Sequence, residues 1–108
     1  MAHTPAPWHV EPIALGDQDS YFEVRADHRT IVQTHARENK TEARRLKEDE
    51  DNCRMIAAAP DILVALKGLL DHYPKYATED TLEQLYGPTT TERVMAARAA
   101  ITKAEGRS

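Results

Sequence analysis

The amino-acid sequence predicts an α+β protein in which an N-terminal three-stranded antiparallel β-meander packs on a C-terminal bundle of three to four helices. Two observations carry this prediction. Short runs of β-branched and aromatic residues, separated by turn residues, occupy positions 8–35. Apolar residues at helical spacing dominate positions 52–105. A length of 108 residues is the usual size of one domain, so we expect a single domain over 1–108.

The N-terminal part begins with an expected extended arm over residues 1–7, because Pro5 and Pro7 disfavour helix in the residues that precede them. The strand-like runs that follow are separated by two clusters of turn residues. In chain order they are Trp8 with Val10 and Ile13, the turn 16–20, Tyr21-Phe22 with Val24, the turn 27–29, and Thr30–Thr34. Short turns between consecutive strands predict the meander.

Residues 36–51 form a charged segment with Leu46 as its one large apolar residue. A segment that buries so little apolar surface predicts a mobile loop that passes into the start of a helix. The acidic run Glu48–Asp51 suits that helix start, where carboxylates meet the positive end of the helix dipole.

Pro60 lies inside the densest apolar stretch, which runs from Asn52 to Leu70. Proline lacks an amide hydrogen and clashes with the preceding helical turn, but it fits the first position of a helix. We therefore expect two helices that meet at Ala59-Pro60, the second with a broad apolar face and an end at Pro74.

Two further helices are expected after Pro74. Capping-box patterns begin at Thr81 and at Thr89, and Gly87-Pro88 is a stop signal between them. The last helix should run from about Thr91 to Ala104. Its narrow apolar stripe should pack against the 60–73 face in an antiparallel hairpin, and comprises Val94, Ala97, Ile101 and Ala104.

A resemblance spans most of the chain. The start Thr4-Pro5-Ala6-Pro7-Trp8 and the core from Asn52 through Arg54 and Ile56-Ala57-Ala58-Ala59-Pro60-Asp61 to Leu63, Ala65 and Leu66 resemble a group of small phage and prophage proteins. That group shares a Thr-Pro-x-Pro-Trp start and an Asn-x-Arg-x-Ile-Ala-Ala-Ala-Pro-Asp-Leu-Leu core. The resemblance implies a phage accessory role, which can include inhibition of a host defence system, as in anti-CRISPR proteins. It implies no reaction.

Composition points to a cytoplasmic protein that lacks cofactors and metals. One cysteine, Cys53, cannot form an internal disulfide, and no apolar run reaches the roughly 18 residues that span a bilayer. The start shows no basic region followed by an apolar one, as a secretory signal would. The five histidines lack the spacing of zinc ligands. The acidic run beside Cys53 should raise the pKa of its thiol, which argues against a nucleophile.

Protein–protein interaction is the function that the sequence favours, because no nucleophile–base pair, phosphate loop or carboxylate pair points to an enzyme. The expected partners are a host or phage protein and further copies of the chain. A nucleic-acid-associated factor that uses the basic residues of 37–47 is the alternative, and the adjacent acids weaken it. Trp8 is either a lid on the core or an exposed anchor. The candidate partner-binding residues are Trp8, Arg44, Arg45, Glu48, Asp49, Glu50 and Asp51.

Overall fold

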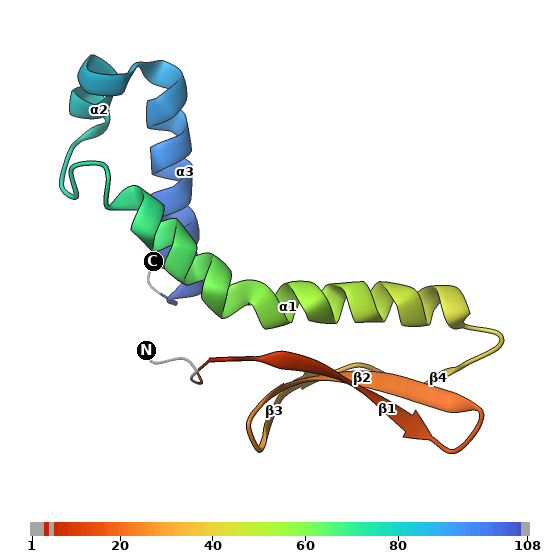
Figure 1. Ribbon diagram of the computed structural model, residues 1–108. Helices are drawn as coiled ribbons and strands as arrows, with labels where there is room; N and C mark the ends of the chain where they lie inside the picture. The colour runs from red at the N-terminus through yellow and green to blue at the C-terminus, as the bar shows by residue number, and fades with distance from the viewer. Residues whose placement is uncertain (1–3, 5, 107–108) are drawn as a thin grey trace. The chain divides into compact units, whose positions relative to one another are not determined.

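The computed structural model describes residue 4 and residues 6–106 (Figure 1). Over these residues the chain forms four strands followed by three helices, which confirms the predicted α+β class. The chain divides into two compact units, Thr4–Asp61 and Ile62–Ser108, which we call the N-terminal and the C-terminal unit. The arm predicted over 1–7 falls partly on residues 1–3 and 5, which lie outside the described residues.

The sheet belongs to the N-terminal unit and has the predicted meander topology. Strands β1 (His9–Leu15), β2 (Asp19–Ala26) and β3 (Arg29–Gln33) are antiparallel in the order β1-β2-β3. Val10 lies opposite Val24 across the first pair, so both side chains point to the same face of the sheet. That face carries the core of this unit, and Val24 is fully buried.

Both hairpin turns lie where the sequence places them. Gly16, in the first turn, has a φ of 72° and Asp27, in the second, has a φ of 52°. Glycine and aspartate are among the residues that adopt this left-handed conformation most readily. The turn residues therefore set the two chain reversals.

A fourth strand, β4 (Arg37–Glu38), lies within the segment predicted to be a loop. It pairs with the start of β2, and the amide of Asn39 donates to the carbonyl of Gln18 at 2.7 Å. The prediction of a loop over this part of 36–51 is therefore wrong. The strand forms because backbone amides and carbonyls of this segment pair with those of β2. The pattern of apolar residues in the sequence gives no information about such backbone pairing.

Helix α1 (Ala43–Leu70) has 28 residues and continues through Pro60, so the prediction of two helices meeting at Ala59-Pro60 is wrong. A proline in a helix interior costs about 3 kcal/mol relative to alanine. Each further residue of a cooperative helix adds a hydrogen bond, so a long helix can continue past one missing bond. The boundary between the two compact units nevertheless falls close to Pro60 in the sequence, between Asp61 and Ile62.

The acidic run Glu48–Asp51 lies inside α1 and not at its start. The first helical hydrogen bond runs from the amide of Leu46 to the carbonyl of Glu42, several residues earlier than predicted. In Figure 1 the first half of α1 runs along one face of the sheet. Cys53 is the buried residue of this helix, at 1% exposure.

The C-terminal unit contains α2 (Glu79–Tyr86) and α3 (Pro88–Ala104). Thr78 caps α2, because its side chain accepts from the amide of Thr81. The predicted cap at Thr81 is therefore three residues late, since Ser, Thr and Asp residues in neighbouring positions compete for the same role.

Helix α3 also begins earlier than predicted, at Pro88 rather than Thr91. Gly87 ends α2 and begins α3, and Pro88 occupies the first helical position, where its missing amide hydrogen costs nothing. Thr91 is buried, and its hydroxyl donates to the carbonyl of Gly87 at 2.8 Å. The core of this unit comprises Leu82, Thr91, Val94 and Ile101.

Candidate functional site

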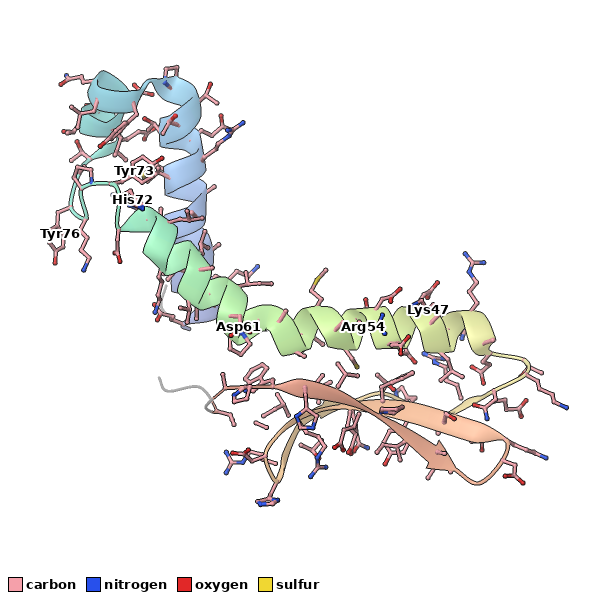
Figure 2. All side chains as sticks on the ribbon, in the orientation of Figure 1. Lys47, Arg54, Asp61, His72, Tyr73 and Tyr76 are labelled. Carbon is pink, nitrogen blue, oxygen red and sulfur yellow. The ribbon has the colours of Figure 1, made fainter. Side chains whose placement is uncertain are left out.

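The predicted partner-binding residues lie mainly on the first turns of α1 in the N-terminal unit, near Lys47 and Arg54 in Figure 2. Four of the side chains are exposed and three are half-buried. The exposed ones are Arg44, Arg45, Glu48 and Asp51, and the half-buried ones are Trp8, Asp49 and Glu50. The structure brings the α1 residues together by helical spacing. No hydrogen bond or ion pair between described residues joins Trp8 to them, and its indole nitrogen donates instead to the carbonyl of Thr4.

Asp49 belongs to an ion pair that the sequence did not predict. The guanidinium of Arg37 lies 2.7 Å from its carboxylate and 3.3 Å from that of Glu42. The contact with Asp49 joins β4 to α1, and the hydrogen bond to Asp49 raises the pKa of Arg37 above its ordinary value. Asp49 is thus held in a contact within the N-terminal unit, and its role in binding a partner stays a prediction.

Three basic side chains of α1, Arg44, Lys47 and Arg54, lie near carboxylates along the helix. Lys47 lies 3.1 Å from Asp51 and 3.4 Å from Glu50, and hydrogen bonding to Asp51 raises the pKa of Lys47. Arg54 pairs with the same two carboxylates, and Arg44 lies 3.8 Å from Glu48. A surface whose cations are paired in this way attracts phosphate weakly.

Cys53 is a buried residue of α1 in the N-terminal unit. Burial, and secondarily the carboxylate of Asp49, raise the pKa of its thiol, as the sequence predicts. A protonated, buried thiol is a poor nucleophile.

Large apolar side chains are unusually exposed along α1. Met55 is 72% exposed, Val64 71%, Leu69 64% and Ile62 55%. Among the described residues ten large apolar side chains are exposed, whereas six apolar residues are buried. The other six exposed ones are Leu15, Val32, Tyr76, Leu85, Tyr86 and Met95. The seven-residue recurrence of Met55, Ile62 and Leu69 is a sequence signal that could have identified this exposed face.

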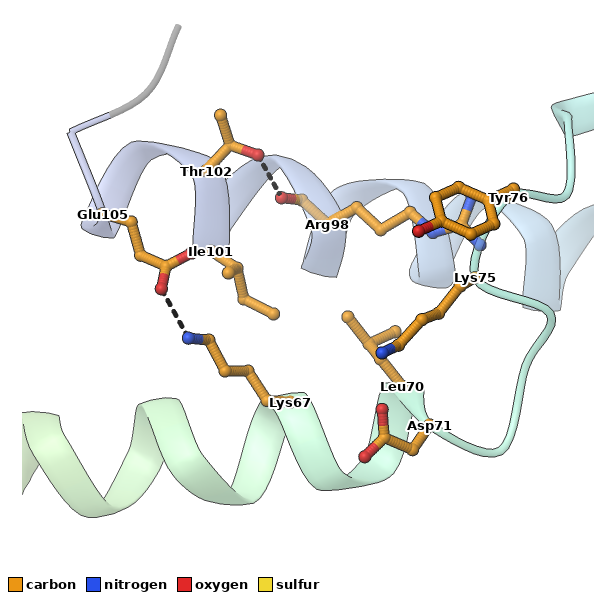
Figure 3. Close-up of a pocket in the computed structure, with 9 residues that line it drawn as sticks. All are labelled: Lys67, Leu70, Asp71, Lys75, Tyr76, Arg98, Ile101, Thr102 and Glu105. Atoms are coloured by element: carbon orange, nitrogen blue, oxygen red, sulfur yellow. Dashed lines mark hydrogen bonds and ion pairs between the residues drawn. The ribbon is translucent and has the colours of Figure 1, made fainter. Parts of the chain in front are cut away.

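The C-terminal unit contains a cavity of about 870 Å³ between the last turns of α1, the segment that follows it, and α3 (Figure 3). Lys67 and Glu105 form an ion pair at one end of it. The guanidinium of Arg98 donates to the carbonyls of Ala77 and Pro74, at 2.9 and 2.7 Å. The lining residues are Lys67, Leu70, Asp71, Lys75, Tyr76, Arg98, Ile101, Thr102 and Glu105. Sequence reasoning missed this site, because its members are distant in the chain.

Within residues 4 and 6–106, no three or more His, Cys, Asp or Glu side chains form a group that could hold a metal ion. No helix in the same part of the chain has the length and apolar character needed to cross a membrane.

Comparison with known protein families gives a match over the whole chain. The family model described as Salmonella phage P22 protein Y8K6 matches residues 1–108. No curated protein and no solved structure matches the chain significantly.

Proposed function

Because the chain belongs to the family of Salmonella phage P22 protein Y8K6, we propose that it is a non-enzymatic phage accessory protein that acts by binding another protein. The observation that carries the proposal is the exposed apolar face of α1 within the C-terminal unit. Ile62 and Leu69, which are seven residues apart and so lie on the same side of the helix, are each more than half exposed there. Full burial of such a side chain stabilises by roughly 1.5–3 kcal/mol relative to full exposure. Binding to an apolar partner surface would therefore be favourable.

The chemistry of the described side chains supports a non-enzymatic role. The one thiol is buried and its pKa is raised, which keeps it protonated at neutral pH. The cavity in the C-terminal unit contains cations and carboxylates, but Lys67 and Glu105 are engaged with each other. Arg98 is engaged with backbone carbonyls. These groups are suited to recognition.

A second copy of the chain is one proposed partner. Ile62, Ala65 and Leu69 share one face of α1, because residues three, four and seven apart lie on the same side of a helix. A small residue between two large ones allows two such helices to approach closely in antiparallel orientation. The proposed state is therefore a homo-oligomer, most simply a homodimer.

The other proposed partner is a host or phage protein in the host cytoplasm. The family supports a phage origin, and inhibition of a host defence protein is the accessory role that we propose. The nucleic-acid alternative has less support, because Arg37, Arg44 and Lys47 are each paired with a carboxylate.

Affinity capture from phage-infected host cells tests the proposal. The tagged wild-type chain should retain a specific protein, and the Ile62→Lys and Leu69→Lys variants should lose it. Gln84→Lys is the matched control, because it adds the same charge at an exposed polar position of α2. Equal capture by all four chains would contradict the proposed face.

Two solution measurements separate the alternatives. Sedimentation at micromolar concentration should give more than one chain mass for the wild type and one chain mass for Leu69→Lys. Titration with generic duplex DNA at low salt should show no binding. Strong binding that falls steeply with salt would favour the nucleic-acid alternative instead.

A further inference from the structure

The cavity of the C-terminal unit differs in charge from the chain as a whole. Its lining has three cations, Lys67, Lys75 and Arg98, and two carboxylates, Asp71 and Glu105, which leaves one positive charge in excess. The whole chain has a formal charge of −4. The cavity is thus a locally basic site on an acidic protein, and its volume of about 870 Å³ is large enough for several side chains of a ligand.

Two of these cations have no carboxylate partner. The half-buried guanidinium of Arg98 donates to two backbone carbonyls, and neither Arg98 nor Lys75 forms an ion pair with any described residue. Lys67, by contrast, is paired with Glu105. A guanidinium has five donors in a fixed planar arrangement, so Arg98 keeps donors for a ligand after its carbonyl contacts are made.

The cavity also offers apolar contact. Leu70 and Ile101 supply aliphatic side chains, and Ile101 is 8% exposed. Figure 3 shows Lys75, Arg98 and Tyr76 at the end of the cavity opposite the Lys67–Glu105 pair. The ring of Tyr76 is 95% exposed, which leaves its whole face available for stacking. Exposed tyrosine beside arginine is a combination enriched where proteins recognise one another.

We infer that this cavity binds a short acidic peptide segment of the partner protein. A carboxylate of the segment pairs with Arg98 and Lys75, and an adjacent apolar side chain contacts Leu70, Ile101 or Tyr76. Asp71 and Glu105 oppose a ligand with continuous phosphate charge, so a carboxylate on a partly apolar peptide fits the lining better. This inference rests on the proposed protein-binding function and adds the chemistry of the partner.

Selection from a library of random peptides about 12 residues long tests the inference, since such a peptide can span the cavity at about 3.3 Å per residue. The immobilised full chain should enrich peptides that combine Asp or Glu with an apolar residue. Binding of one enriched peptide is then measured by fluorescence anisotropy against two variants. Lys75→Glu reverses a charge in the cavity, and Lys103→Glu makes the same change at an exposed position of α3 outside it.

Lys75→Glu should lower the affinity for the peptide by about tenfold or more, because it replaces an attraction by a repulsion. Lys103→Glu should change this affinity by less than about twofold. Enrichment of basic or uncharged peptides, absence of enrichment, or equal loss in both variants would overturn the inference. Each of these outcomes leaves the capture experiment on the α1 face unaffected. Failure here is therefore distinguishable from failure of the proposed function.

Discussion

The two compact units use opposite kinds of surface. Of the eleven ion pairs between described residues, ten lie in the N-terminal unit and one, Lys67–Glu105, in the C-terminal unit. Exposed large apolar side chains show the reverse, with three in the first unit and seven in the second. In the first unit, charged side chains at the surface form ion pairs with one another. The second leaves large apolar side chains exposed, and it is the unit to which we assign the proposed partner.

The largest expected effect comes from the core of the C-terminal unit. Leu82→Ala should destabilise it by about 2–5 kcal/mol, because Leu82 is fully buried and its truncation leaves a cavity. Amide hydrogen exchange should accelerate throughout α2 and α3, while the amides of β1 and β2 keep their protection. Equal acceleration in both units would show that the two units unfold together and would remove the basis of the comparison.

Pro60→Ala should strengthen the helix that passes from one unit to the other. It restores an amide donor and removes a clash, so α1 should gain up to about 3 kcal/mol. Circular dichroism during urea unfolding measures the gain as a higher midpoint. A lower midpoint would mean that Pro60 stabilises the fold. Ala99→Pro, in the exposed interior of α3, serves as the destabilising control.

The buried thiol of Cys53 should make the stability of the N-terminal unit decrease at alkaline pH. Its folded-state pKa is raised by burial above the usual value of 9.0, so the unfolded chain loses the thiol proton first. Stability from this group is present below pH 9.0 and falls as pH rises further, by up to about 1.4 kcal/mol per pH unit. Urea midpoints at several pH values should fall less steeply for Cys53→Ala than for the wild type. Parallel curves would contradict the buried thiol.

The smallest effects should distinguish two kinds of ion pair. Arg54→Gln should change stability by less than about 0.5 kcal/mol, because its carboxylate partners are one helical turn away on a largely exposed surface. Arg37→Gln should cost more, since Arg37 contacts two carboxylates and its contact with Asp49 joins β4 to α1. Thermal unfolding at low and high salt measures both. A larger loss for Arg54→Gln would reverse the ranking.

Local patterns in the sequence predicted the parts of the fold that depend on neighbours in the chain. Alternation around Val24 and the turn residues Gly16 and Asp27 placed three strands, and helical spacing placed Val94 and Ile101 in a core. Pro60 misled the prediction because a local preference was outweighed by the cooperativity of a 28-residue helix.

The candidate site depends on contacts that spacing cannot reveal. Arg98 reaches carbonyls 21 and 24 residues away, and Arg37 reaches a carboxylate 12 residues away. Such contacts depend on how the elements meet, which a single sequence read in short windows does not report. The predicted residues Arg44, Glu48 and Asp51 proved to be exposed members of helical pairs, and their role in binding stays a prediction.

The turn between α2 and α3 depends on the positive φ of Gly87. Gly87 has a φ of 86° and a ψ of 171°, a conformation that glycine alone among the natural residues adopts readily. A Cβ added there would meet no atom within 4 Å, so backbone chirality is the whole obstacle. The mirror image of this conformation is ordinary extended backbone. A chemically synthesised chain with D-alanine at position 87 should therefore keep the turn that L-alanine would strain.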